Sequence, residues 1–252
     1  MPKYVLFDTE TTGNQDEDRI IQLGAMIVDA KAPIEVYDEI CFTDVEIKLE
    51  AMEVHNITPD MIIGQPEATQ TKFYQKLQEY NNPSNYLIAH NINFDLGMIK
   101  KEGFESKYQI LDTLRCAQHL FPELPYHRLQ YLRYALDIYM DEEEEAAKHN
   151  ITIKAHDALG DVLVMKLFLS QLVAKCRTVY PDFNPMEKLV ELTKTPVFIQ
   201  TFKFGKYKGK ETTQVAKEDP SYIMWMMKNM DMDENLKYTL EKLTSTATND
   251  YY

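Results

Sequence analysis

The chain has 252 residues, of which 44% are hydrophobic and 27% charged, and its formal net charge is −13. This composition is ordinary for a globular chain with one full-sized domain and a small second one, and the negative charge disfavours a broad basic surface for nucleic acid. Since no apolar stretch is long enough to cross a membrane and no basic-then-apolar signal segment opens the sequence, we expect a soluble cytoplasmic protein of bacterial type that does not bind membranes.

Five short apolar runs predict the strands of a mixed sheet. Lys3–Asp8, Ile20–Asp29 and Ile34–Cys41 are joined by short turns, which is typical of an antiparallel meander. Tyr86–Ala89 and Gln109–Asp112 are flanked by helical patterns, as parallel strands of an α/β sheet are. Three antiparallel and two parallel strands with packed helices describe an RNase H-like α/β fold with a five-stranded sheet.

Three helices are expected beside this sheet. Glu67–Tyr80 and Leu129–Leu136 carry apolar residues on one face, and Asp157–Lys175 is apolar on nearly all sides. The last of these should therefore be buried against the sheet. The acidic run Asp141–Glu145 indicates a solvated insertion before this helix.

Proline and glycine residues divide the remainder of the chain. Asn184 and Pro185 are suited to the cap and first position of a short helix. Gly205 and Gly209 predict a hairpin, and Asp219 precedes a final helical region. The predicted domains are an RNase H-like α/β domain at 1–178, a linker with a short helix at 179–195, and a small C-terminal hairpin-and-helix module at 196–252.

Three cysteines, Cys41, Cys116 and Cys176, lie far apart and form no Cys-x-x-Cys pair. Their odd number and spacing favour reduced thiols in the core over disulfides or a zinc site.

Four carboxylates stand in settings that suit metal-assisted hydrolysis of a phosphodiester. Asp8 and Glu10 end the first strand two positions apart, so their side chains point to the same side and can share a metal. Asp161 would approach from the buried helix, and Asp95 would reach a second ion directly or through water. Such an all-oxygen set favours Mg²⁺ or Mn²⁺, and two ions about 4 Å apart can hold both the attacking and the leaving oxygen.

His156 is the candidate general base that takes a proton from the attacking water. On an ideal helix it would lie roughly 140° away from Asp161, too far round to serve the same site. It can serve that site if the helix begins near Asp157, whose carboxylate is a suitable cap.

The order Asp8-x-Glu10, then Asp95, then His156-x-x-x-x-Asp161 resembles the three motifs of the DEDDh branch of the DnaQ-like 3′–5′ exonuclease superfamily. The resemblance spans residues 1 to about 175 and supports the roles given above to these five side chains. It also implies contacts with the terminal nucleotide. The residues concerned are Thr11, Met52, His55, His90, Asn91 and Phe94.

Lysines and aromatic residues alternate from Thr201 to Lys210, and this segment, with Asp219-Pro220 and Trp225 after it, resembles the C-terminal region of the bacterial exodeoxyribonuclease X family. The segment can be a platform for stacking and phosphate contact, or a hairpin with its aromatics in a small core and its lysines in water. We expect Trp225 to be a core anchor. The candidate nucleic-acid contacts are Lys203, Lys206, Tyr207, Lys208 and Lys210.

The leading hypothesis is a 3′–5′ exodeoxyribonuclease that uses two Mg²⁺ or Mn²⁺ ions to release nucleoside monophosphates from single- or double-stranded DNA, in DNA repair. An exoribonuclease that trims RNA ends is the first alternative, since the same catalytic set serves both sugars. A binding subunit without catalysis, attached to a polymerase, is the second. The complete set of carboxylates disfavours this last alternative.

Overall fold

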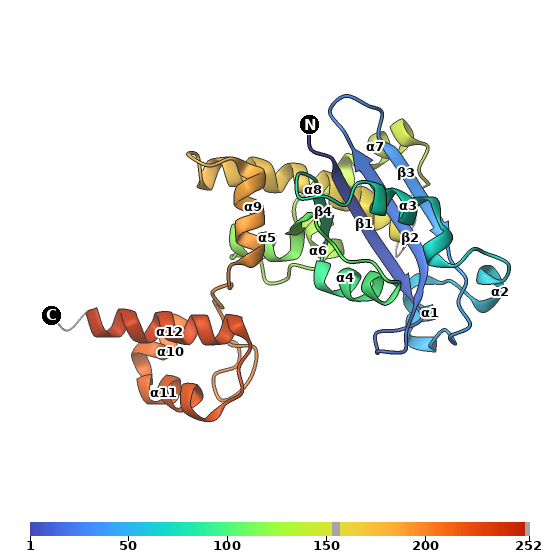
Figure 1. The fold of residues 1–252 in the computed structure, drawn as a ribbon. Coiled ribbons are helices and arrows are strands. Elements are labelled where there is room, and N and C mark those ends of the chain that lie inside the picture. Colours follow the sequence, from blue (N-terminus) through green and yellow to red (C-terminus); the bar gives the residue numbers. More distant parts are fainter. Residues whose placement is uncertain (153–156, 250–252) are drawn as a thin grey trace. The chain divides into compact units, whose positions relative to one another are not determined.

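The computed structural model describes residues 1–152 and 157–249, and the chain divides into two compact units (Figure 1). The first contains residues 1–120 and 124–193, and the second contains residues 121–123 and the chain from residue 194 onward. Helix α9 (Pro185–Lys194) therefore belongs to the first unit as far as Thr193. The finer division with a linker at 179–195 stays a prediction.

The first unit is built on a five-stranded sheet in the order β3-β2-β1-β4-β5, so the expected fold is confirmed. Strand β2 pairs antiparallel with β1 and β3, while β4 pairs parallel with β1 and β5. The strands are β1 (Tyr4–Thr11), β2 (Ile20–Val28), β3 (Glu35–Ile40), β4 (Tyr86–Ala89) and β5 (Gln109–Asp112). The main difference from the prediction is that β1 continues past Asp8 to Thr11, which places Glu10 inside the strand.

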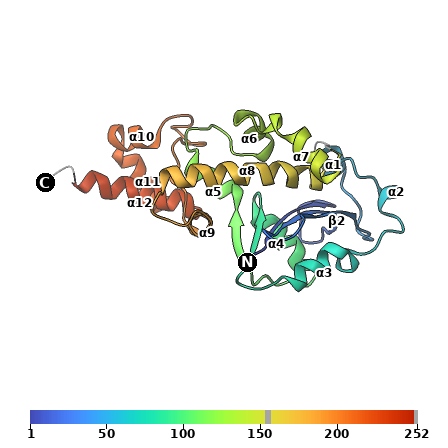
Figure 2. The same cartoon turned by 90° about the horizontal axis from the view of Figure 1, so that it is seen from above.

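Helices cover both faces of the sheet, with α8 on one side and α3 on the other (Figure 2). The α3 side is packed by Phe73, Tyr74 and Leu77, which are buried against apolar residues of the sheet. The helices of this unit besides α9 are α1 (Leu49–His55), α2 (Pro59–Ile62), α3 (Lys72–Glu79), α4 (Ile92–Lys101), α5 (Thr113–Leu120), α6 (Leu129–Ala135), α7 (Glu142–His149) and α8 (Ala158–Val179), with 3₁₀ turns at Ala68–Gln70 and Ile138–Met140.

Helix α8 is the predicted buried helix, and it begins where its cap was expected. Asp157 is the N-cap, and its side chain accepts a hydrogen bond from the Gly160 amide. The start of the helix lies directly on β2 because Gly24 has no side chain. A Cβ at that position would lie 2.3 Å from the Ala158 carbonyl carbon and 2.4 Å from the Leu159 nitrogen. Gly24 therefore sets how closely α8 approaches the sheet.

The acidic run is only in part the solvated insertion that was expected: Asp141, Glu143 and Glu144 are exposed, but most of the run forms the first turn of α7 and two of its glutamates are paired. Glu142 is buried and its carboxylate forms a bidentate ion pair with Arg133 of α6. Glu145 pairs with Lys166 of α8, and this bond holds the pKa of the glutamate down to about 2. Acidic side chains in a first turn also interact favourably with the helix dipole. The run thus ties α7 to its two neighbours.

The second unit has its own core, around Phe202, Val215, Ile223, Met226 and Leu240. Its helices are α10 (Thr212–Glu218), α11 (Pro220–Asn229) and α12 (Glu234–Asn249). The predicted hairpin is reduced to one antiparallel bridge between Thr201 and Glu211. The prediction that Trp225 anchors the core is wrong, since 52% of its surface is exposed.

Two expectations from composition can be checked in the described ranges. None of the helices there combines the length and the apolar character needed to cross a membrane. The three cysteines are buried and free, as predicted. Burial raises the pKa of Cys41 and Cys116 to about 12, so these thiols stay protonated and unreactive.

Candidate active site

Strand β1 presents Asp8 and Glu10 on the face of the sheet that α8 covers. Asp8 lies opposite Gly24 and Glu10 lies opposite Gln22 on the neighbouring strand. Because side chains alternate along a strand, Thr9 between them points to the other face, towards α4. The two predicted carboxylates therefore share one face, as the spacing required.

Asp95 reaches the same end of β1 from the first turn of α4. Asn91 precedes that helix in the left-handed conformation (φ 72°), and its amide donates to Asp112 Oδ1 at 3.0 Å, which fixes the turn from β4 into α4. Asp95 is buried, and its Oδ1 accepts hydrogen bonds from the Thr9 amide at 3.1 Å and the Thr9 hydroxyl at 2.8 Å. These bonds tie α4 to the strand that carries the other carboxylates.

Asp161 is in the first turn of α8, and two glutamines position this part of the helix. Gln22 of β2 donates to Asp157 Oδ1 at 2.9 Å and accepts from the Ala158 amide, so it anchors the cap of α8. Gln130 of α6 donates to Asp161 Oδ1 at 2.6 Å. His156, the predicted base, lies outside the described residues.

The carboxylates form a region of concentrated negative charge. Burial, together with the nearby charges of Asp161 and Asp95, raises the pKa of Glu10 to about 8. Burial and the same two neighbours also raise the pKa of Asp8 well above its ordinary value. Burial raises the pKa of Asp95 to about 7, against the opposing effect of the hydrogen bonds from Thr9. The charged groups that shift Asp8 and Glu10 are all carboxylates, so the site favours a proton or a cation.

The donor chemistry of this site fits a hard divalent cation, because its oxygen ligands are those that Mg²⁺ and Mn²⁺ prefer. As the side chains stand, however, no three Asp, Glu, His or Cys groups in residues 1–152 and 157–249 lie close enough to hold an ion. Two of the acids are turned towards neutral partners, Asp161 to Gln130 and Asp95 to Thr9. Binding of a cation would therefore require these carboxylates to move closer together.

Helix α1 carries Met52 and His55, two of the predicted substrate contacts, and its first residues are bonded to the end of β1. The amide of Lys48, its cap residue, donates to the Thr12 carbonyl at 2.9 Å. His55 is buried, and its Nδ1 accepts from the Ile57 amide at 2.9 Å. Burial lowers the pKa of His55 against a smaller opposing effect of the Thr11 backbone. Within the described residues its buried Nε2 makes no hydrogen bond, although the Thr11 backbone acts on the ring.

His90 is held inside the fold by both ring nitrogens. Its Nδ1 lies 2.9 Å from the Thr113 hydroxyl and its Nε2 lies 2.8 Å from the His127 carbonyl. Burial lowers its pKa to about 4, so it is neutral at physiological pH. Phe94 is half-buried against the core on the α3 side. Substrate contact by these residues, by Asn91, and by Thr11, Met52 and His55 stays a prediction.

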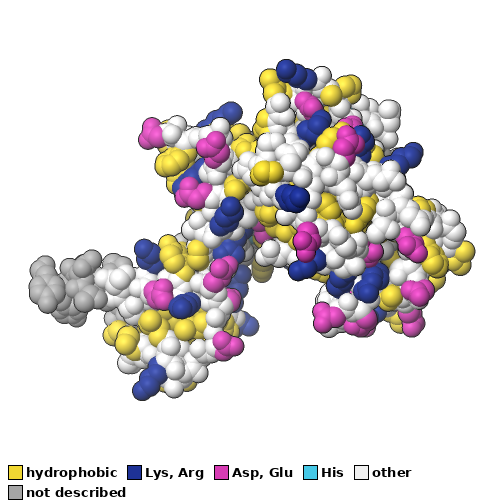
Figure 3. Space-filling view, in the orientation of Figure 1, with side chains coloured by type: hydrophobic (Ala, Val, Ile, Leu, Met, Phe, Trp, Pro, Cys, Tyr) yellow, Lys and Arg dark blue, Asp and Glu magenta, His cyan; other side chains and the backbone are white. Residues whose placement is uncertain are grey.

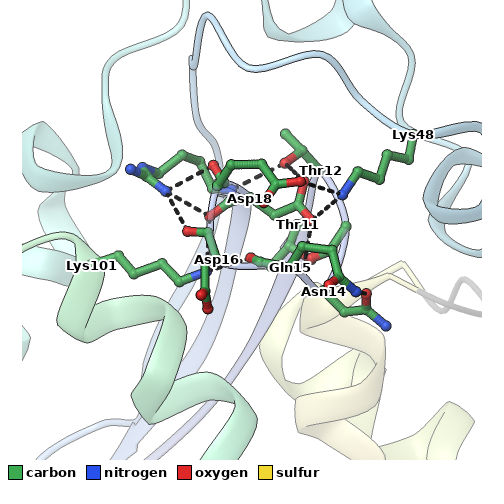
Figure 4. Close-up of polar contacts among 11 residues, drawn as sticks. Thr11, Thr12, Asn14, Gln15, Asp16, Asp18, Lys48 and Lys101 are labelled. Carbon is green, nitrogen blue, oxygen red and sulfur yellow. Dashed lines mark hydrogen bonds and ion pairs between the residues drawn. The ribbon is translucent and has the colours of Figure 1, made fainter.

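The turn after β1 is fixed by a second acidic group, Asp18, which is buried. Its carboxylate accepts from the Thr12 hydroxyl at 2.8 Å, the Gln15 amide at 2.7 Å and Lys48 Nζ at 2.7 Å. Lys101 donates to the Gln15 carbonyl at 2.8 Å, and the two lysines approach the turn from opposite sides (Figure 4). Burial alone would raise the pKa of Asp18. The hydrogen bonds lower this pKa by more than burial raises it, so it lies below its ordinary value.

Three polar residues of this region escaped prediction from the sequence, namely Thr9, Gln22 and Gln130. A polar residue within the apolar run Ile20–Val28 is a usable signal for Gln22, because a buried amide needs partners. Gln130 carries no such signal, since it belongs to an ordinary amphipathic helix and meets Asp161 only through the tertiary fold.

Comparison with known proteins assigns both parts of the chain. Residues 5–168 match the family described as Exonuclease, and residues 202–231 match the family described as Exodeoxyribonuclease X-like C-terminal. The chain is 26% identical to Exodeoxyribonuclease 10 of Escherichia coli strain K12 over 239 residues, which covers 94% of this chain and 96% of the relative. It is 34% identical over 170 residues to DNA polymerase III PolC-type of Bacillus cereus, but spans only 11% of that protein.

Solved structures support the fold. Exonuclease X in complex with 5′ overhanging duplex DNA matches with a TM-score of 0.54 and 19% identity, over 75% of this chain and 99% of that one. Escherichia coli Exonuclease I in complex with a dA16 oligonucleotide matches with a TM-score of 0.52 and 21% identity, over 76% of this chain and 42% of that one. A zinc-bound form of the latter enzyme with single-stranded DNA has a TM-score of 0.51 at 21% identity, over 75% of this chain and 42% of that one.

The Exonuclease match covers more than half of the chain and includes Asp8, Glu10, Asp95 and Asp161. The resemblance inferred from their order is therefore confirmed. The chain belongs to the exonuclease family, whose DnaQ-type members depend on metal, and it is a 3′–5′ exonuclease with an exodeoxyribonuclease X-like C-terminal region.

Proposed function

We propose that this exonuclease acts on DNA, releasing nucleoside monophosphates from 3′ ends as part of DNA repair in the cytoplasm. The choice of DNA is supported by the similarity to Exodeoxyribonuclease 10, which extends over 94% of the chain and so includes both units. The observation that carries the chemistry is the group of buried and half-buried carboxylates at the end of β1, which raise one another's pKa values. Such charge is stabilised when a cation binds, as two-metal phosphodiester hydrolysis requires.

Asp8, Glu10, Asp95 and Asp161 would hold two Mg²⁺ or Mn²⁺ ions. When bound, the ions supply Lewis-acid stabilisation of the charge that develops on the phosphate oxygens. Thr9 and Gln130 orient Asp95 and Asp161 through the hydrogen bonds described above. Partners that orient metal ligands are themselves needed for affinity and rate.

His156 would act as the general base. It directly precedes Asp157, the cap of α8, so it is next to the helix turn that carries Asp161. A histidine is neutral in part of its population near pH 7 and can accept a proton from water. Its imidazole would take the proton of the attacking water, and the water oxygen would add to the phosphorus of the 3′-terminal nucleotide. The bond from that phosphorus to the 3′ oxygen of the penultimate nucleotide would break, which releases a nucleoside 5′-monophosphate and leaves a 3′ hydroxyl on the shortened strand.

One assay tests the substrate, the polarity and the metal together. Purified protein is incubated with single-stranded DNA, duplex DNA and RNA of the same sequence, each labelled at the 5′ or the 3′ end. Magnesium, manganese, zinc or chelator is added in parallel. We expect 5′-labelled DNA to shorten stepwise with magnesium or manganese and 3′-labelled DNA to yield labelled mononucleotide at once.

Faster removal of ribonucleotides than deoxyribonucleotides would favour the exoribonuclease alternative. Full activity in chelator would exclude the metal mechanism, and absence of cleavage on every substrate would favour the non-catalytic alternative. The matched control is Asp29→Asn, because Asp29 also follows a strand but is paired with Lys3 at 2.7 Å. This variant should retain the rate of the unchanged protein.

A further inference from the structure

Helix α11 of the second unit has one buried face and one face open to solvent. Ile223 and Met226 are buried in the core of the unit. Met224 and Trp225 next to them are 59% and 52% exposed. Contiguous exposed apolar side chains, unlike singly scattered ones, are a feature of binding surfaces. The family motifs in the first unit do not account for this surface.

The exposed indole rests on a ring that the protein holds in place. The rings of Tyr222 and Trp225 are stacked, with centroids 5.9 Å apart and planes inclined by 20°. Tyr207 packs edge-on against Tyr222 at 5.0 Å. Gly205 admits the tyrosine, because a Cβ there would lie 2.6 Å from the Tyr222 hydroxyl. Tyr222 is thereby clamped, and it supports one face of a large, half-exposed aromatic ring.

Asp219 fastens the lysine-rich loop to this helix. It caps α11 by accepting from the Tyr222 amide at 3.1 Å, and it also accepts from the Tyr207 hydroxyl at 2.7 Å and Lys206 Nζ at 3.1 Å. Hydrogen bonds from Ser221, Tyr207 and Lys206 lower its pKa. Two of the predicted nucleic-acid contacts, Lys206 and Tyr207, are therefore engaged in holding the loop, whereas Trp225 presents a more exposed aromatic surface than Phe204 of that loop (52% against 39%).

Charge and shape at this surface suit a nucleotide. Residues 194–252 carry nine lysines and eight acidic residues, whereas the whole chain has a net charge of −13. The exposed face of α11 borders a shallow hollow of about 490 Å³ lined by Ser221, Met224, Trp225, Met227, Lys228 and Asn229. On the face of this unit seen in Figure 3, apolar side chains lie among both Lys and acidic side chains.

We propose that this hollow binds an unpaired nucleotide of single-stranded DNA, with the base stacked on Trp225 and the phosphate beside Lys228. Aromatic rings combined with lysines are the usual means of holding single strands without regard to sequence. A base within a duplex is already stacked on both sides, so the platform selects unpaired strands. The choice of DNA as the ligand rests on the proposed function, but the platform itself is independent of the carboxylate site.

Trp225 is the only tryptophan of the chain, so its fluorescence reports on this surface alone. The full-length protein is titrated with oligothymidylate in chelator, which prevents cleavage. We expect saturable quenching of the tryptophan emission as bases stack on the ring. An oligomer of the same length made of abasic sites keeps the phosphates but should bind more weakly and leave the emission nearly unchanged.

Variants separate stacking from charge. Trp225→Ala should weaken binding of oligothymidylate roughly tenfold, measured by anisotropy of a labelled strand, while Trp225→Phe should recover much of the affinity. Lys228→Gln should reduce the dependence of affinity on salt by about 0.7 in the logarithmic slope. Lys237→Gln is the matched control, since Lys237 is exposed on α12 and does not line the hollow. Because Trp225 and Lys228 are exposed, these changes should not unfold the unit.

Equal affinity of Trp225→Ala and the unchanged protein would overturn the proposal, as would equal quenching by the abasic strand. Failure to bind any single strand, with the surface instead needed for binding a protein, would also overturn it. Nuclease assays on the same samples keep the two proposals apart. If Trp225→Ala binds single strands normally and still cleaves, only the proposed platform is rejected. If the unchanged protein binds single-stranded DNA but does not cleave it, only the proposal that DNA is the substrate of the nuclease is rejected.

Discussion

The acidic side chains at the start of the chain differ in their surroundings, and Asp18 is buried whereas Asp8 and Glu10 are half-buried. Asp18 in the turn after β1 is surrounded by donors, among them the ammonium group of Lys48 at 2.7 Å, and its pKa is lowered. Asp8 and Glu10 on β1 are influenced mainly by burial and by other carboxylates, and their pKa values are raised.

The difference separates a structural acid from the acids that we propose as metal ligands. Burying a charge destabilises the folded state unless the charge is paired. The ion pair and hydrogen bonds of Asp18 offset the desolvation of its carboxylate, and they fix the turn. The β1 carboxylates lack this compensation inside the protein and become stable only with protons or with an external cation. A site kept in this state is suited to bind metal. The predictions below test this contrast.

The largest effect is expected from the carboxylates themselves. Asp8→Asn and Asp161→Asn keep the shape of the side chain but remove a charge needed for the cation. Activity should fall by more than about 100-fold, beyond the usual effect of losing a partner outside the metal ligands. The melting temperature in chelator should stay equal or rise, because repulsion is relieved. Rates within tenfold of the unchanged protein would contradict the assignment of these two residues.

His156→Ala should slow cleavage at neutral pH by about 10²–10⁴-fold, the usual contribution of a general base. Binding of metal, measured by calorimetry, should survive, because the carboxylates remain. The pH profile distinguishes a base from a structural residue, since the acidic limb of the rate should flatten in the variant. A variant with normal rates would remove His156 from the mechanism.

Much of the fold was predictable because its strands are apolar runs bounded by turns. Tyr86–Ala89 and Gln109–Asp112 were predicted to the residue. The acidic run was misread because its partners, Arg133 and Lys166, are distant in sequence, so that nothing local shows that the glutamates are neutralised. Trp225 was misread because an aromatic residue is usually buried, and exposure depends on the face of α11 it occupies.

In the candidate site, too, some features could be predicted from local sequence and others depend on contacts between distant elements. The order of the catalytic acids and the cap at Asp157 follow from local sequence and helix geometry. The hydrogen bond from Gln130 to Asp161 and the enclosure of His90 depend on packing between elements. Local patterns indicate which groups do the chemistry, whereas tertiary contacts decide which groups orient them.

The contrast also predicts how stability depends on pH. Folding raises the pKa of Asp8, Glu10 and Asp95, the latter two to about 8 and about 7. The folded state therefore binds more protons than the unfolded state between about pH 4 and pH 8, and its free energy of unfolding should fall as the pH rises through this range. We expect a loss of about 2–4 kcal/mol between about pH 5 and pH 8 in chelator.

Urea unfolding at several pH values measures this loss. Magnesium should reduce it, because a cation takes over the role of the protons. Asp8→Asn should reduce it as well, whereas Asp18→Asn should not. A free energy of unfolding that rises with pH over this range in chelator would mean that the β1 carboxylates are compensated after all.

The smallest effect is expected from Asp18, whose pKa is lowered in the folded protein. Its stabilising contribution is present above its ordinary pKa and is lost as the pH falls through the lowered value. Asp18→Asn should reduce the free energy of unfolding at neutral pH by about 1–2 kcal/mol, less than for an enclosed pair, because Lys48 is 36% exposed and can turn to water. Lys48→Met alone and combined with Asp18→Asn completes a double-mutant cycle that isolates the pair.

Turnover of Asp18→Asn at saturating substrate should change less than about tenfold, since the turn carries none of the proposed metal ligands. A loss of turnover as large as that of Asp8→Asn, with the fold intact, would place Asp18 among the functional acids and end the distinction between the two groups.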